Sequence, residues 1–157
     1  DIKLKQWMMH PSKRAKLGDF NRAEMMDWNE EQQAYCSYAN GEVYGIHRSP
    51  EEMRDDWLSE KIDVYSFGNL VYELLTGLWV FYENSDDEVI QDNVIAGKRA
   101  FIDDRYRHRS YIEGKLIELI EKCWIEDPRK RIDIFEAVRF LRTILEENNK
   151  QGRRWIS

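Results

Sequence analysis

The stretch SEKIDVYSFGNLVYELLTG, residues 59–77, decides the fold of this chain. Apolar side chains recur at helical spacing from Val64 to Leu75. Other apolar residues fall on the remaining faces, and a helix that is apolar nearly all round is a buried one. Gly77 is a natural C-terminal stop, because glycine adopts the left-handed conformation that often ends a helix. The stretch therefore predicts a buried central helix over residues 59–76.

Three more helices are predicted after it. One opens with the capping pattern Ser85-Asp86-Asp87-Glu88 and runs to about Gly97. Another spans roughly residues 111–125 and ends before Pro128, since the residue preceding a proline disfavours helix. Its expected inward residues are Ile112, Leu116, Ile120 and Cys123 or Trp124. The last opens at Asp133 with a capping glutamate at 136, and its expected inward face holds Val138, Leu141 and Leu145.

The first third of the chain is predicted to be strand and loop. Residues 10–15 contain Pro11 and Ser12 and indicate a turn between two short extended pieces. Residues 22–48 show no stable periodicity and are interpreted as a long irregular loop. A loop of that length inside a compact domain is usually functional or mobile.

Composition limits the class of protein. The 157 residues correspond to one domain, with the 42% hydrophobic and 34% charged residues typical of a globular chain. A net charge of −6 argues against nucleic acid or an anionic membrane as the main partner. Two distant cysteines favour reduced thiols over a disulfide framework or a zinc site. Without a membrane-length apolar run or a signal peptide, an intracellular, cytoplasmic protein is expected, with upstream targeting signals left open.

Five short motifs occur in a fixed order: DIKLKQ at 1–6, GDFN at 18–21, RSPEE at 48–52, DVYSFG at 63–68 and CWIEDPRKR at 123–131. Together they resemble the C-terminal lobe of a eukaryotic-type protein kinase. The resemblance implies a mainly α fold, in which a short strand and catalytic-loop region precedes a helical bundle, within an α+β parent fold. It implies a partial kinase domain over residues 1–145 and a polar tail over residues 146–157.

The kinase catalytic loop reads H-R-D-L-x-x-x-N, and DIKLKQ is similar to its second half. The resemblance implies that Asp1 accepts the proton of the substrate hydroxyl, and that Lys3 neutralises charge on the transferred phosphoryl group. Gln6 stands where the family has an asparagine that binds Mg²⁺ through its side-chain oxygen. Met8 belongs to an apolar run that in kinases lies beneath the adenine ring, although core packing explains such a run equally well.

GDFN resembles the D-F-G element of kinases. Asp19 would then hold the Mg²⁺ that bridges the ATP phosphates, because a hard cation prefers carboxylate oxygen. Phe20 would pack inward and set the position of the loop. Asn21 replaces the family's glycine, and asparagine is among the residues that best tolerate a positive φ. We therefore expect Asn21 to make the left-handed turn.

The remaining motifs imply structural roles. Ser49-Pro50-Glu51 resembles A-P-E, which implies an ion pair between Glu51 and Arg131 that fastens the end of the loop to the helical lobe. Asp63 would support the backbone of the catalytic loop, although a helix cap is the ordinary alternative. The segment between Asp19 and Glu51 would be the activation segment, where Ser37 is a possible phosphorylation site.

The resemblance predicts a Mg²⁺-dependent kinase that transfers the γ-phosphate of ATP to protein Ser or Thr. Lys3 favours Ser/Thr transfer, whereas the Cys-Trp pair at 123–124 resembles tyrosine-kinase-like families. One alternative is a pseudokinase that acts as a binding or scaffold module, which Gln6 and Asn21 favour. A helical interaction domain with chance motif matches is the other. The Gly-rich loop and ATP-anchoring lysine have no counterpart in these residues, so this stretch alone is expected to be inactive and to require an N-lobe.

Overall fold

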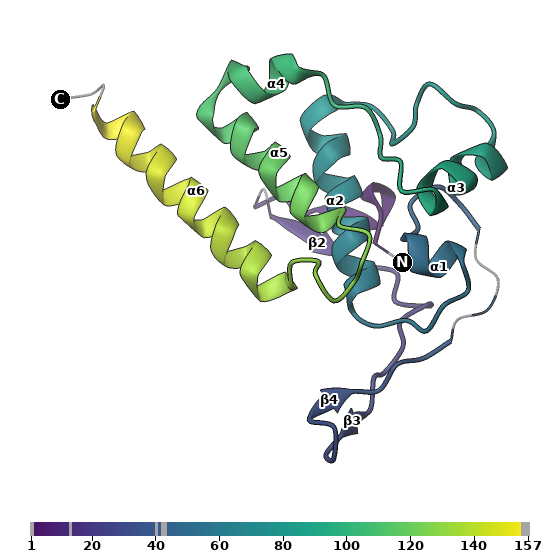
Figure 1. Cartoon of the computed structure of the whole chain (residues 1–157). Helices are drawn as coiled ribbons and strands as arrows, with labels where there is room; N and C mark the ends of the chain where they lie inside the picture. Colours follow the sequence, from purple (N-terminus) through teal and green to yellow (C-terminus); the bar gives the residue numbers. More distant parts are fainter. Residues whose placement is uncertain (1, 13, 40, 42–43, 155–157) are drawn as a thin grey trace.

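A computed structural model describes residues 2–12, 14–39, 41 and 44–154, with side chains as far as residue 150. The fold is mainly α, as the sequence predicts, and the helices gather around α2 (Figure 1). The elements are a 3-10 helix η1 (Leu4–Gln6), strands β1 (Trp7–Met9), β2 (Ala15–Leu17), β3 (Trp28–Asn29) and β4 (Ala34–Tyr35), and helices α1 (Pro50–Met53), α2 (Lys61–Thr76), α3 (Asp87–Ile95), α4 (Asp104–Arg109), α5 (Tyr111–Cys123) and α6 (Ile134–Arg154).

Helix α2 is the predicted central helix, and α5 packs directly on it. Gly77 caps its C-terminus at φ 72° and donates its N–H to the Glu73 carbonyl at 2.9 Å. The two helices approach closely at Gly68, where a Cβ atom would come within 2.7 Å of the Cys123 Cβ. Any larger residue at position 68 would push α5 away, because closely packed interiors do not absorb extra atoms.

The core has two clusters on either side of this contact. The larger one joins α2 to α3 and to the segment before it, and the smaller one joins α2, α5 and α6. Cys123 lies in the smaller cluster, and its burial raises the pKa of its thiol to about 12. Cys36 is exposed in the loop before α1, so both cysteines are free thiols, as the sequence predicts.

Two small antiparallel hairpins precede the helices. β1 pairs with β2 in the register Trp7 with Leu17, which confirms the predicted extended pieces around a turn. β3 and β4 form a second hairpin inside the segment that was interpreted as an irregular loop. Its strands have two residues each, too short for an alternating pattern to be visible in sequence. The ring of Trp28 stands edge-on to that of Tyr35, with centroids 5.0 Å apart.

The predicted helices are present, with local differences. Asp86, not Ser85, caps α3, and its carboxylate accepts two backbone N–H groups of the first turn. α5 begins after Ser110 and buries Ile117 and Leu119, which the expected inward face omitted. The short helices α1 and α4 were not predicted, because four and six residues give no measurable period.

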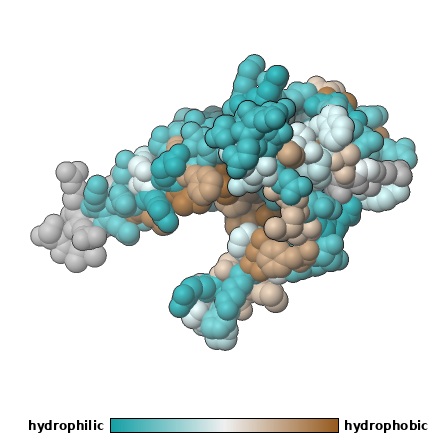
Figure 2. Space-filling view, turned by 90° about the horizontal axis from the view of Figure 1, so that it is seen from below, coloured by the Kyte–Doolittle hydropathy of each residue, from teal (hydrophilic) through white to brown (hydrophobic). Residues whose placement is uncertain are grey.

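Helix α6 differs most from its prediction. It opens with the expected Asp133–Glu136 capping box but continues through Arg154, so residues beyond 145 are helical. Its buried residues are Ala137 and Ile144, whereas Leu145 is 61% exposed. Leu141 packs against the core as expected, but Val138 and Leu145 are exposed, because apolar residues occur on two sides of this helix. Figure 2 shows apolar surface along α6, where Ile134, Phe135, Val138 and Leu145 are exposed.

No helix in the described part of the chain combines the length and the apolar character needed to cross a membrane.

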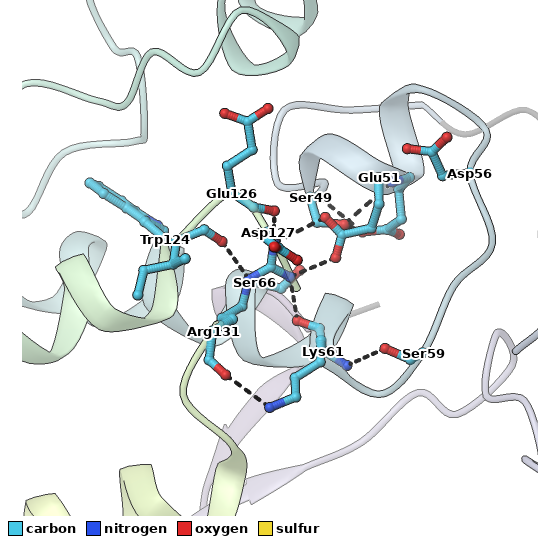
Figure 3. Close-up of polar contacts among 12 residues, drawn as sticks. Ser49, Glu51, Asp56, Ser59, Lys61, Ser66, Trp124, Glu126, Asp127 and Arg131 are labelled. Atoms are coloured by element: carbon cyan, nitrogen blue, oxygen red, sulfur yellow. Dashed lines mark hydrogen bonds and ion pairs between the residues drawn. The ribbon is translucent and has the colours of Figure 1, made fainter. Parts of the chain in front are cut away.

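The buried side chain of Arg131 ties three parts of the chain together (Figure 3). Its guanidinium makes a bidentate ion pair with Glu51 of α1, at 2.6 and 3.0 Å. It also donates to the carbonyls of Ile125, Lys61 and Glu126, at 2.8 to 3.1 Å. All five N–H donors of the guanidinium are thus used, which a lysine could not reproduce.

We expect Arg131→Met to lower the free energy of unfolding by about 3–5 kcal/mol, because it leaves the Glu51 carboxylate buried without its cation. Urea denaturation followed by tryptophan fluorescence measures this. Arg129→Met is the matched control, since Arg129 lies in the same connection but pairs with Asp127 at the exposed surface. Equal midpoints for the two variants would contradict the central role of Arg131.

Candidate active site

Two backbone features bring the catalytic-loop motif and the GDFN motif together. The β1–β2 pairing aligns the chain on either side of the turn, and the Gly18 N–H donates to the Gln6 carbonyl at 2.9 Å. A Cβ at Gly18 would come within 2.8 Å of the Met8 methyl group, the mobile end of an exposed side chain. Asp19 therefore emerges beside η1. The predicted proton acceptor Asp1 lies outside the described residues.

A cavity of about 230 Å³ lies where these motifs meet the start of α2. Asp19 and Phe20 line it from the GDFN motif, Asp63 lines it from the first turn of α2, and Arg48 lines it from the loop before α1. The structure thus places residues of three separate predicted motifs around one cavity. Asp63 is exposed at this wall, and its predicted support of the catalytic loop stays a prediction.

Among the described residues, the charged side chains that line the cavity are five carboxylates, those of Asp19, Glu24, Glu52, Glu60 and Asp63, and two arginines, Arg22 and Arg48. The pKa of Lys3 is lowered, mainly by burial and then by the neighbouring charge of Arg48. The charge of Asp19 acts in the opposite direction and raises it. Lys3 is therefore close enough to both groups to sense their charges. Because carboxylates predominate in this lining, a phosphate ligand at the cavity would need an accompanying divalent cation.

Gln6 is buried, with 5% of its surface exposed. Its side-chain oxygen accepts the Lys3 N–H at 3.1 Å, which closes the single turn of η1. The oxygen expected to bind a metal is thus turned back toward its own loop. Met8 is 61% exposed within this chain, and its predicted place beneath the adenine ring stays a prediction.

Two expectations for the GDFN motif are wrong. Phe20 is 65% exposed and does not pack inward. It opens a surface turn, closed by the Ala23 N–H donating to the Phe20 carbonyl at 3.1 Å, and little chain surrounds a side chain at such a corner. The left-handed residue is Asp19, at φ 61°, and not Asn21. Aspartate shares the tolerance of asparagine for this conformation, and sequence alone did not decide which residue would adopt it.

Asp19 can hold a divalent cation through its carboxylate, because it lines the cavity and projects from a turn. Among the described residues, no group of three His, Cys, Asp or Glu side chains is arranged to hold a metal. A Mg²⁺ ion at Asp19 would therefore depend on nucleotide phosphates and water for further ligands, which is common for this ion.

A capping box anchors the segment that precedes α1. Ser49 and Glu52 satisfy each other's backbone N–H groups, and both are buried. Glu52 also accepts from Arg48 at 3.2 Å. The S-x-x-E pattern at 49–52 is the sequence signal for this capping box. The predicted ion pair between Glu51 and Arg131 is present and fixes α1, the helix that follows Ser49.

A buried pair of titratable side chains, His47 and Glu73, lies behind this segment and was missed from sequence. The His47 Nδ1 is 3.4 Å from the Glu73 Oε1, and neither Glu73 oxygen has a hydrogen-bond partner within the described part of the chain. Burial raises the pKa of Glu73 to about 7, while burial and the charges of Lys3, Arg48 and Lys5 lower the pKa of His47 to about 4. Both groups are thus largely neutral between these values.

The backbone at this pair is fixed to α2. The His47 carbonyl accepts from Ser66 Oγ at 3.0 Å and from Asn69 Nδ2 at 3.2 Å. Asn69 in turn accepts from the Trp124 indole at 2.7 Å, so the segment before α1 is connected to the end of α5. Ser66 and Asn69 are polar residues on an otherwise apolar helix, and this is the sequence signal for the contact between α2 and the His47 backbone.

Ser37 is exposed in the loop between Asp19 and Glu51 and does not line the cavity at Asp19. It lines a separate open hollow together with Arg54, Lys61 and Arg129. Its phosphorylation stays a prediction.

A model of the protein kinase domain matches residues 1–140. This chain belongs to the protein kinase family. It is 29% identical over 153 residues to dual specificity protein kinase shkE of Dictyostelium discoideum, an alignment that covers 97% of this chain and 20% of the relative. It is 26% identical to integrin-linked protein kinase 1 of Arabidopsis thaliana, covering 97% of this chain and 31% of the relative.

Another relative is serine/threonine-protein kinase 12 of Arabidopsis thaliana, 27% identical, with 99% of this chain and 32% of the relative covered. The chain spans between a fifth and a third of the length of these three relatives. The fold is thus that of a kinase C-terminal lobe, as the motif order predicts.

The His47–Glu73 pair predicts a pH dependence that appears only when one partner is removed. In Glu73→Gln, His47 is left with a pKa of about 4 against an ordinary 6.5, so folding stability should fall as pH drops from about 6.5 to 4. In His47→Gln, Glu73 is left with a pKa of about 7 against 4.5, so stability should fall as pH rises from about 4.5 to 7.

In the unaltered protein, His47 makes folding stability rise with pH and Glu73 makes it fall with pH. The two effects offset each other between about pH 4.5 and pH 6.5. Denaturant midpoints measured from pH 4 to pH 8 on the three proteins test this. Parallel profiles for the two variants would show that the pair does not titrate as described.

Proposed function

We propose that this chain forms the C-terminal part of an active protein kinase, which transfers the γ-phosphate of ATP to Ser or Thr of a protein substrate. The supporting observation is the hydrogen bond from the Gly18 N–H to the Gln6 carbonyl, which brings the catalytic-loop and GDFN motifs together beside the cavity at Asp19. The names of the relatives include dual specificity and serine/threonine-protein kinases, which agrees with this proposal.

In this proposal Asp1 orients the substrate hydroxyl and accepts its proton. Lys3 is close enough to Arg48 and Asp19 to sense the charges of both, and in this proposal its ammonium group faces the transferred phosphoryl oxygens. Asp19 holds Mg²⁺, which when bound neutralises charge on the phosphates. Met8 contributes an accessible apolar surface for the adenine ring. An N-lobe outside these residues would supply the Gly-rich loop and the anchoring lysine.

A binding or scaffold module is the alternative function, and one observation favours it. The Gln6 oxygen is engaged by the Lys3 N–H, so the second metal-ligand position of kinases is turned away from the site. Asp19 argues for the enzyme, since the main metal-binding carboxylate is retained and projects into the cavity.

We expect Asp19→Asn to reduce phosphate transfer by about 100-fold or more, because a bound metal contributes several kcal/mol to the transition state. The measurement is transfer of labelled phosphate from ATP to casein by the full-length protein. Asp27→Asn is the matched control, an exposed aspartate in the same segment that does not line the cavity. Retained activity in Asp19→Asn would refute the assigned metal role.

Gln6→Asn separates the two functions. For an active kinase, the shorter amide should reach the metal position and lower the Mg²⁺ concentration for half-maximal rate by about tenfold. For a binding module, the unaltered protein should bind nucleotide without transferring phosphate, and Gln6→Asn should not restore transfer. A titration of rate against Mg²⁺ distinguishes these outcomes.

A further inference from the structure

A hollow of about 460 Å³ lies at the corner where α5 ends and α6 begins, and the proposed catalysis does not use it. This corner is visible between the two labelled helices in Figure 1. Its apolar lining comes from Ile125, Ile132 and Phe140, which are half-buried. It shares no lining residue with the cavity at Asp19. It is therefore a separate surface feature of the C-terminal lobe.

Three cations surround this apolar lining: Lys122 on α5, Lys130 in the connection and Arg139 on α6. The side chains of Lys122 and Arg139 make no hydrogen bond or ion pair within the described part of the chain. Lys130 is 77% exposed and lies 3.8 Å from an Asp127 carboxylate oxygen, a weak contact at the surface.

The side chains that line the hollow carry a net positive charge, whereas the whole chain is acidic. The hollow's one carboxylate, that of Glu136, accepts the Asp133 N–H at 3.1 Å as part of the α6 capping box. Arginines of α4 are paired instead, as Arg107 is with Glu121 and Arg109 with Glu113. The hollow therefore carries a local excess of positive charge on a chain whose net charge is −6.

We propose that this hollow docks an acidic peptide segment of a partner protein, with one or two apolar side chains seated on Ile125, Ile132 and Phe140. Charge complementarity selects the acidic residues, because cations at a rim attract an opposite charge and set the register of a peptide. The apolar lining supplies the complementary surface for Leu or Phe. Its volume lies within the range of about 300–1,000 Å³ found for small binding pockets.

A short peptide fits this surface better than a polyanion. Exposed charges act over a screening length of about 8 Å at physiological salt, so a short segment senses mainly the local cations. A nucleic acid or an anionic membrane would extend over the acidic remainder of the surface, where the net charge of −6 opposes it.

The test uses a fluorescein-labelled peptide, EEDLFEDE, added to the full-length protein and followed by fluorescence anisotropy. We expect saturable binding that weakens with salt, and at least about tenfold weaker binding to Arg139→Glu. Arg142→Glu is the matched control, because it makes the same charge change on the same helix but does not line the hollow. It should change the dissociation constant by less than about twofold.

A second variant, Lys122→Glu, changes a cation that lines the hollow from α5. It allows the proposal to be tested even if Arg139→Glu does not fold. It should also weaken binding by about tenfold. Absence of saturation below about 1 mM, equal losses in the Arg139 and Arg142 variants, or equal binding of the neutral peptide QQNLFQNQ would each overturn the proposal.

Discussion

The hydrogen bonds and ion pair made by the Arg131 guanidinium are the contacts on which the remaining structure depends. The guanidinium is buried, and its five donors are divided among the Glu51 carboxylate and three backbone carbonyls. Because those carbonyls belong to the first residue of α2 and to the connection after α5, α1 cannot move independently of either helix. A network this complete avoids the usual cost of an unpaired buried charge.

Several contacts at the active site follow from this fixed α1. The Ser49–Glu52 capping box orients the backbone just before the helix, and Arg48 pairs with Glu52 on the side of the cavity. The preceding residue, His47, is fastened to α2 through its carbonyl. The loop between Asp19 and α1 thus ends at residues fixed by several hydrogen bonds, while its β3–β4 hairpin protrudes from the body (Figure 1).

The sequence predicted those elements whose signal is carried by many residues. The apolar period of α2, its terminal Gly77 and the order of the motifs required no knowledge of tertiary contacts. Errors occurred where one residue's neighbours decide its conformation. Asp19 rather than Asn21 adopts the positive φ, and the exposed side of α6 could not be distinguished from its buried side.

The His47–Glu73 pair illustrates a different limit of sequence reasoning. Its members are far apart in the chain, and each alone is an ordinary polar residue. Their unusual protonation arises from burial between α2 and the anchored loop, which is a property of the folded state alone.

The two cysteines differ sharply in chemical accessibility. The thiol of Cys123 is enclosed by α2 and α6, and a pKa of about 12 leaves almost none of it as the reactive thiolate. Cys36 is exposed, directly after β4 on the protruding hairpin. A fluorophore or spin label can therefore be attached at Cys36 without mutating this chain, giving a direct spectroscopic reporter of the motion of this hairpin.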